Sequence, residues 1–155
     1  MRFGGGQRGA SVGAGAQLVA STACLGVLCI PWVQTGSIRR SAFRVVGALR
    51  GAGLMSRAPA QGFFVVIALV PGLVGAVWVL WAAGLRRTSG LAAAAAGALT
   101  LSGALVVGET ARHRATAGLT LAALVGAVAL GLGLIALIRP PPPRPRPAPS
   151  RKAVA

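Results

Sequence analysis

The stretch at residues 62–85, GFFVVIALVPGLVGAVWVLWAAGL, is 24 residues long and contains no ionisable side chain. The hydrocarbon core of a bilayer is about 30 Å thick, and a helix that rises about 1.5 Å per residue needs roughly 20 apolar residues to cross it. Because water is absent there, the backbone must satisfy its own hydrogen bonds, which a helix does within one segment. This stretch therefore predicts a transmembrane helix.

Composition agrees with a chain that lacks a water-facing surface. Only 11% of its 155 residues are charged, whereas a soluble domain carries about 25%. Sixteen Lys and Arg stand against one acid, Glu109. Lipid phosphates are suitable counter-ions, so we expect anionic membrane lipids as partners. The basic residues are divided among termini and loops instead of forming one stripe with stacking aromatics, which argues against nucleic acid.

Apolar runs of membrane-spanning length recur along the chain. They predict an all-α fold, a polytopic integral membrane protein in which four transmembrane helices form a small bundle. The predicted spans are residues 12–33, 62–85, 90–107 and 117–138, between a flexible lead at 1–11 and a basic, proline-rich, disordered tail at 139–155. Alanine dominates 90–107 and buries little area, so insertion of that span is expected to depend on neighbouring helices.

The first span begins like a signal peptide, with a positive flank followed by small and apolar residues. Because the apolar run continues to about residue 33, a retained signal-anchor helix is the favoured interpretation. A lipoprotein box that ends at Cys24 is the alternative. Cys24 and Cys29 are five residues apart, which fits neither Cys-x-x-Cys redox chemistry nor a metal clamp.

The loop at residues 36–61 is strongly basic. Read at 100° per residue, its apolar residues fall on one side and Arg40 and Arg44 on the other, which predicts an amphipathic helix lying among the lipid headgroups. The apolar residues are Ile38, Ala42, Val45, Leu49 and Ala52. A solvated basic loop is the alternative, since Gly47, Gly51 and Gly53 lower the helix propensity.

Tryptophan and arginine at the ends of spans are typical of headgroup contact. The candidate lipid- or partner-contact residues are Trp32, Arg39, Arg40, Arg44, Arg50, Trp78, Trp81, Arg86 and Arg87. Pro71 predicts a kink in the second span, and a broken helix that marks a binding site is the alternative interpretation. In the last span, Gly118, Ala122 and Gly126 are four apart and predict close helix packing.

Orientation follows from the basic residues on the two sides of four spans. The side that holds both termini carries nine, and the side that holds the first and third loops carries seven. The positive-inside rule therefore predicts a plasma membrane protein with cytoplasmic termini.

The chemistry available argues against an enzyme. One Glu and no Asp exclude a carboxylate pair within the chain. Glu109 and His113 lack a third ligand at metal spacing, so no metal or other cofactor is expected, and a helix-end ion pair of Glu109 with Arg112 or His113 is the favoured interpretation. The polar groups within the spans are Gln17, Ser21, Thr22, Thr100, Ser102 and Thr120, which suit interhelical hydrogen bonds and line a passive pore only in an oligomer.

Residues 31–54, PWVQTGSIRRSAFRVVGALRGAGL, resemble the segment after the first helix in uncharacterised four-helix membrane proteins of actinobacteria. In that group Pro-Trp ends the first span and an Arg-Ser-x-Phe element follows, here Pro31, Trp32, Arg40, Ser41 and Phe43. The resemblance implies an extracytoplasmic first loop and no particular activity.

Together these features favour a non-enzymatic accessory or scaffold protein of the cell envelope, which contacts lipids or another membrane protein and is a possible homo-oligomer. The alternative is an oligomeric passive channel or transporter component for a small solute.

Overall fold

A computed structural model describes residues 5–35, 37–51, 53, 57–110 and 115–138 of the chain. In chain order these residues form α1 (Gly5–Cys29), β1 (Pro31–Thr35), β2 (Ile38–Ser41), α2 (Ala42–Gly51), α3 (Arg57–Ala82), α4 (Arg86–Thr110) and α5 (Ala117–Ile138). The prediction of a mostly helical fold is confirmed, although the two strands were not predicted. The proposed tail at 139–155 lies outside the described residues.

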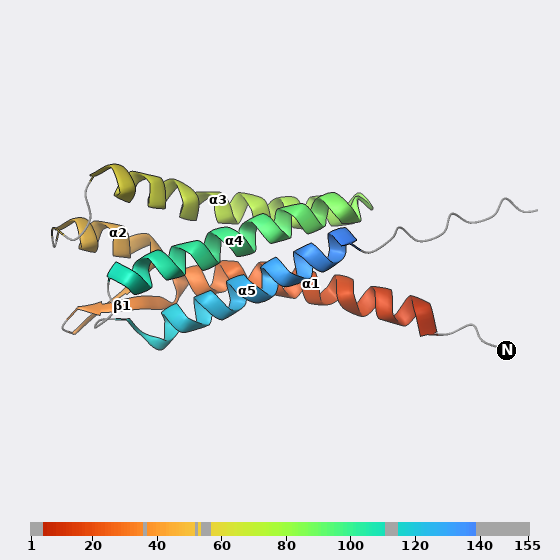
Figure 1. Cartoon of the computed structure of the whole chain (residues 1–155), viewed down its shortest axis with the longest axis horizontal. Helices are drawn as coiled ribbons and strands as arrows, with labels where there is room; N and C mark the ends of the chain where they lie inside the picture. Colours follow the sequence, from red (N-terminus) through yellow and green to blue (C-terminus); the bar gives the residue numbers. More distant parts are fainter. Residues whose placement is uncertain (1–4, 36, 52, 54–56, 111–114, 139–155) are drawn as a thin grey trace, which may run out of the picture.

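The four long helices lie side by side along the long axis of the molecule (Figure 1). The strands β1 and β2 form an antiparallel hairpin, which lies with α2 at one end of the bundle. The turn between α3 and α4 lies at the other end, together with the start of α1 and the end of α5. We call these the hairpin end and the turn end.

Among the described residues, three helices are long and apolar enough to cross a membrane: Gln61–Ala82 within α3, the whole of α4, and α5. A 22-residue helix is about 33 Å long, which matches a bilayer core. The bounds predicted for the last span agree with α5, and the predicted alanine-rich span is extended by α4 at both ends. Half of the most apolar part of α4 is buried, consistent with a helix that depends on its neighbours.

The first predicted span differs most from the structure. Helix α1 begins at Gly5, within the predicted flexible lead, because adding turns to an existing helix is much easier than starting one. It ends at Cys29, and its apolar part, Gly13–Cys29, is shorter than the three candidate spans. Residues 31–33 were predicted to be helical but belong to β1. Pro31 disfavours helical backbone at the preceding residue, and Val33 suits a strand.

The second predicted span is a continuous helix in the structure. Pro71 lies within α3 on its exposed side, and the helix runs on to Ala82, so the chain is not unwound there. Gly84 then adopts a φ of 76°. The backbone N–H of Leu85 donates to Leu80 and that of Gly84 donates to Trp81. This is a Schellman motif, and it turns the chain directly into α4.

Helices α4 and α5 approach each other through glycine. A Cβ atom on Gly126 would lie 2.7 Å from the backbone nitrogen of Leu101 and 2.9 Å from the carbonyl oxygen of Gly97. A Cβ atom on Gly133 would lie 2.5 Å from the nitrogen of Ala94. The two backbones are therefore in contact with no side chain between them, as small residues permit in membranes.

The predicted ladder of small residues on α5 is buried throughout, but its members meet different partners. Gly126 packs on α4, whereas a Cβ atom on Gly118 would collide with the carbonyl oxygen of Pro31. Ala122 lies between them and is fully buried. The ladder thus joins α5 to α4 and to the junction between α1 and β1.

Replacing Gly126 by Ala should lower the stability of the bundle by about 1–3 kcal/mol, because the new methyl group overlaps backbone atoms that cannot move aside. The check is the unfolding midpoint of purified protein in detergent. Gly131→Ala is the matched control on the same helix, since a Cβ atom there meets nothing within 4 Å. Equal midpoints for the two variants would contradict the close approach.

Candidate functional site

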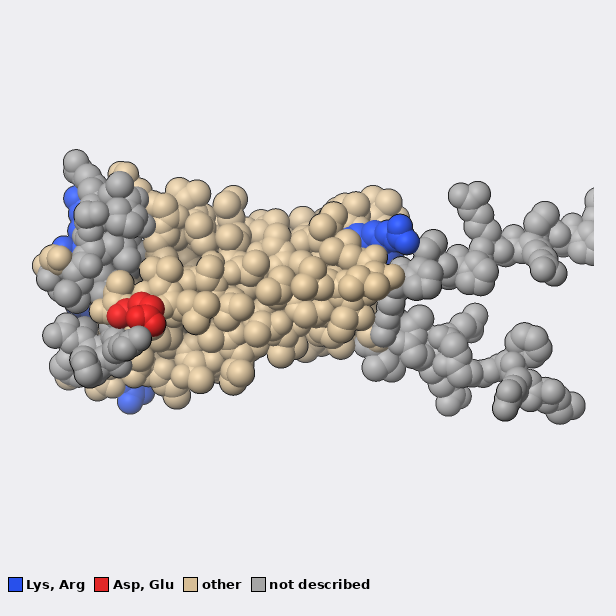
Figure 2. Space-filling view, in the orientation of Figure 1, with Lys and Arg blue, Asp and Glu red and all other residues tan. Residues whose placement is uncertain are grey.

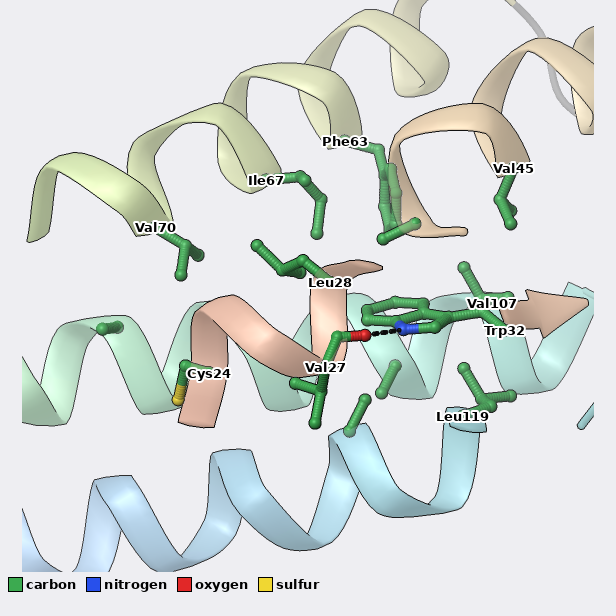
Figure 3. Packing of buried hydrophobic residues seen from close by; sticks show 14 of the residues in the cluster. Cys24, Val27, Leu28, Trp32, Val45, Phe63, Ile67, Val70, Val107 and Leu119 are labelled. Atoms are coloured by element: carbon green, nitrogen blue, oxygen red, sulfur yellow. Dashed lines mark hydrogen bonds between the residues drawn. The ribbon is translucent and has the colours of Figure 1, made fainter. Parts of the chain in front are cut away.

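Trp32 occupies the centre of the hairpin end. Helix α1 ends just before Pro31, which has no backbone N–H, so the carbonyl of Val27 has no donor four residues later. The indole Nε1–H of Trp32 donates to that carbonyl at 2.7 Å instead (Figure 3). The Pro-Trp pair therefore ends the helix and also supplies the hydrogen bond that the proline removes.

The prediction that Trp32 contacts lipid or a partner is wrong for this chain, because the side chain is 0% exposed. It belongs to the main cluster of buried residues, beside Phe63 of α3, Val107 of α4 and Leu119 of α5 (Figure 3). A tryptophan near a span end usually lies at the headgroups. Here the chain turns back as a strand, so the indole points into the bundle.

Strand β1 is held on both sides. Val33 pairs with Arg40 of β2 and also forms an isolated bridge with Ala115, which lies just before α5. Thr116 strengthens this junction, because its backbone N–H donates to the carbonyl of Trp32 at 3.0 Å and its hydroxyl donates to the carbonyl of Pro31. The hairpin is thereby fixed level with the start of α5.

The candidate arginines on the loop gather at the hairpin end. Arg39 is exposed and Arg40 is half-buried on β2, while Arg44 and Arg50 are exposed on α2. Figure 2 shows basic side chains at both ends of the molecule and a middle without charged side chains on the visible face. The single acid, Glu109, lies exposed at the hairpin end. Its predicted partners, Arg112 and His113, are outside the described residues.

The amphipathic helix predicted in this loop is present in part. Ala42 and Val45 of α2 are buried and Arg44 is exposed, as the pattern predicted. Ile38 instead lies on β2 and is 56% exposed. The helix runs roughly along the long axis beside α3 instead of across it, because its apolar face packs on the protein core (Figure 1).

The remaining candidate residues lie at the turn end. Trp78 and Trp81 are exposed on the last turns of α3, and Arg86 and Arg87 are exposed at the start of α4. The indole N–H of Trp78 donates to the hydroxyl of Thr22 on α1 at 3.2 Å. The predicted contact residues are therefore divided between two opposite ends, with Trp32 alone in the core.

A buried polar cluster also lies nearer the turn end. The side-chain amide of Gln17 on α1 donates to the hydroxyl of Ser89 on α4 at 3.2 Å, and Ser89 donates to the carbonyl of Val77 on α3 at 3.1 Å. The cluster ties three helices together where hydrogen bonds have no competition from water. Ser89 was not singled out from the sequence, because it follows Arg86 and Arg87 in what reads as a polar turn.

The polar residues proposed for a pore do not share one surface. Gln17, Ser21 and Thr100 are buried, and the two hydroxyls donate to backbone carbonyls four residues earlier. Thr22, Ser102 and Thr120 are exposed on three different helices. Within the part of the chain that the structure describes, no group of three or more His, Cys, Asp or Glu side chains is placed to hold a metal ion.

The outer surface of the bundle is apolar. Phe63, Ile67, Val70, Val74 and Val77 form the buried face of α3. The other faces of the helices expose large apolar side chains, among them Phe64, Val65, Leu69, Val79, Leu105, Leu124, Val128 and Leu134. A helix that is apolar on all sides belongs in a protein core or a bilayer. Since these side chains face outward, the surface is suited to lipid.

No protein-family model, curated protein sequence or solved structure matches this chain. The fold and the placement of its side chains therefore carry the functional argument.

Trp32→Phe should lower the free energy of unfolding by about 1–3 kcal/mol, because the carbonyl of Val27 then stays buried without a donor. Trp81→Phe is the comparison. Because the Trp81 side chain is 37% exposed, this change should alter the free energy of unfolding by less than about 0.5 kcal/mol. Denaturant unfolding in detergent micelles measures both. A Trp32→Phe protein as stable as wild type would show that the indole N–H is dispensable.

Proposed function

We propose that this chain is an integral membrane protein of the cell envelope that acts without catalysis, as an accessory or scaffold contacting lipids or another membrane protein. The observation that carries the proposal is the apolar outer surface between two ends that bear the exposed arginines. Its helices pack through glycine backbone contacts and one buried polar cluster, which is a structural use of the available polar groups. The described side chains form a bundle whose free surfaces are suited to binding.

In the proposed topology α1 is a fourth span beside α3, α4 and α5. Its apolar part is about 26 Å long at a helical rise of about 1.5 Å, slightly less than a bilayer core, and the helix continues for eight residues before Gly13. Four crossings place both termini on the same side, as the positions of Gly5 and Ile138 at the turn end suggest. That side is proposed to be the cytoplasm, which leaves the hairpin end outside the plasma membrane.

Paired topology reporters test this arrangement. One reporter is active only in the cytoplasm and the other only outside, and each is fused after Gly36, Ala52, Arg87, Thr110 or Ala155. We expect Gly36, Ala52 and Thr110 to report outside, and Arg87 and Ala155 to report inside. A first loop and a C-terminus on the same side of the membrane would overturn the four-span arrangement.

Cross-linking in native membranes tests the scaffold role. A photo-reactive residue in place of Ile38 samples the hairpin end, and one in place of Leu124 samples the exposed face of α5. We expect lipid adducts at Leu124, and adducts with anionic lipid or with a discrete protein at Ile38. Capture of neither a protein nor an anionic lipid at either position would count against the proposal.

The rival hypothesis, an oligomeric passive channel, needs the exposed hydroxyls of Thr22, Ser102 and Thr120 to meet across subunits. Purified protein in liposomes distinguishes the two hypotheses. The scaffold hypothesis expects ion and small-solute fluxes equal to those of protein-free liposomes, whereas a flux that scales with protein content supports the channel.

A further inference from the structure

Arg40 lies level with the ends of the spanning helices. Arg40 pairs with Val33, and Val33 also forms a bridge with Ala115. These three residues, from three chain segments, therefore lie side by side in one row. Ala115 lies between the end of α4 at Thr110 and the start of α5 at Ala117. A residue in this row is therefore at the depth where two spans leave the hydrocarbon core, which is the depth of the lipid phosphates.

Arg40 also carries a donor that the described chain does not satisfy. Its Nε atom is buried, and no acceptor among the described residues meets it. A guanidinium presents several N–H donors in a planar fork that matches the oxygens of a phosphate. A buried N–H without an acceptor is unfavourable, so the negative charge of a phosphate close to this guanidinium is favoured.

The surroundings add charge and apolar surface. Arg39 on β2 and Arg44 on α2 are exposed near Arg40 in the chain, and the protein has a single acid with which to neutralise its arginines. Phe43, between Ser41 and Arg44, is 42% exposed. Arg40 thus has exposed arginines and a partly exposed phenyl ring within four residues of it in the chain.

We infer that Arg40 binds the headgroup phosphate of an anionic phospholipid at the hairpin end, with Arg44 of α2 adding positive charge. This inference rests on the proposed membrane function and names its ligand. A phospholipid fits the depth of the row and the exposed phenyl ring together, whereas a free phosphate uses only the charge. An acidic protein partner needs no particular depth, and the experiment below separates it from the lipid.

Quenching of a tryptophan reporter by brominated lipids tests the inference. In the variant Phe43→Trp with Trp78→Phe and Trp81→Phe, the reporter directly precedes Arg44 and follows Arg40 by three residues, and the remaining Trp32 is fully buried. The protein is reconstituted in vesicles of phosphatidylcholine mixed with brominated phosphatidylglycerol or with brominated phosphatidylcholine. We expect association of phosphatidylglycerol near the reporter to be stronger by about fivefold or more.

Substitutions in that background separate a site from diffuse attraction. Arg40→Gln should remove most of the preference, and Arg40→Lys should weaken it, because the charge remains while the fork is lost. Arg39→Gln removes one charge from an exposed residue of the same strand and should have a smaller effect. The paired change Arg86→Gln and Arg87→Gln, at the opposite end, should leave the preference unchanged. Inorganic phosphate in the buffer should not displace the lipid.

Three results would overturn the inference. Equal quenching by the two lipids means that no anionic lipid is selected, and it leaves an acidic protein as the ligand for these arginines. Equal losses in Arg39→Gln and Arg40→Gln mean diffuse attraction without a site. Quenching of the reporter by neither lipid means that the hairpin end is away from the bilayer. If Trp78 and Trp81 of the wild-type protein, exposed on α3, are also unquenched, the proposed membrane function fails with it.

Discussion

The hairpin end depends on a hydrogen bond that a proline makes necessary. Pro31 cannot donate to the carbonyl of Val27, and that carbonyl belongs to a buried residue. The indole of the next residue makes the bond, which turns the chain sharply and carries the largest buried side chain into the bundle. The strand, its pairing with β2 and its contact with the start of α5 all follow from this change of direction.

Away from this end, the bundle is held by contacts that remain effective in lipid. Apolar side chains gain little by leaving lipid for other apolar side chains, so backbone proximity and hydrogen bonds become more important. Gly97 and Gly126 bring two helix backbones together, and Gln17 with Ser89 links three helices nearer the turn end. The outward faces keep large apolar residues, since the surrounding lipid is itself apolar.

The sequence predicted the parts of the fold that depend on long apolar runs. The bounds of α5 agree with the prediction, and α3 and α4 agree within a few residues at most ends, because a continuous apolar stretch has only one favourable state in a bilayer. The hairpin was missed because Trp32 and Val33 read as a continuation of the first apolar run. Its pairing with Ala115 depends on segments far apart in sequence, which local patterns do not report.

The candidate contact residues were predicted less completely. Most of the candidate arginines, with Trp78 and Trp81, are exposed near the helix ends, but their contacts with lipid or a partner stay a prediction. The burial of Trp32 depends on what the preceding proline does to a carbonyl five residues back, and composition does not show that. The importance of Gly97 and Gly133 was also hidden, because glycine is frequent along the chain and only the packing distinguishes the positions that need it.

The two sides of β1 become available at different moments of synthesis. The bond from Trp32 to Val27 joins residues five apart, so its two partners are synthesised almost together. The bond from Thr116 to Pro31 joins residues 85 apart, which corresponds to roughly 4–17 s of translation at about 5–20 residues per second. During that interval the edge of β1 that pairs with Ala115 lacks its partner. The segment that leads into α5 therefore covers the free edge of β1, and α5 itself packs on α4.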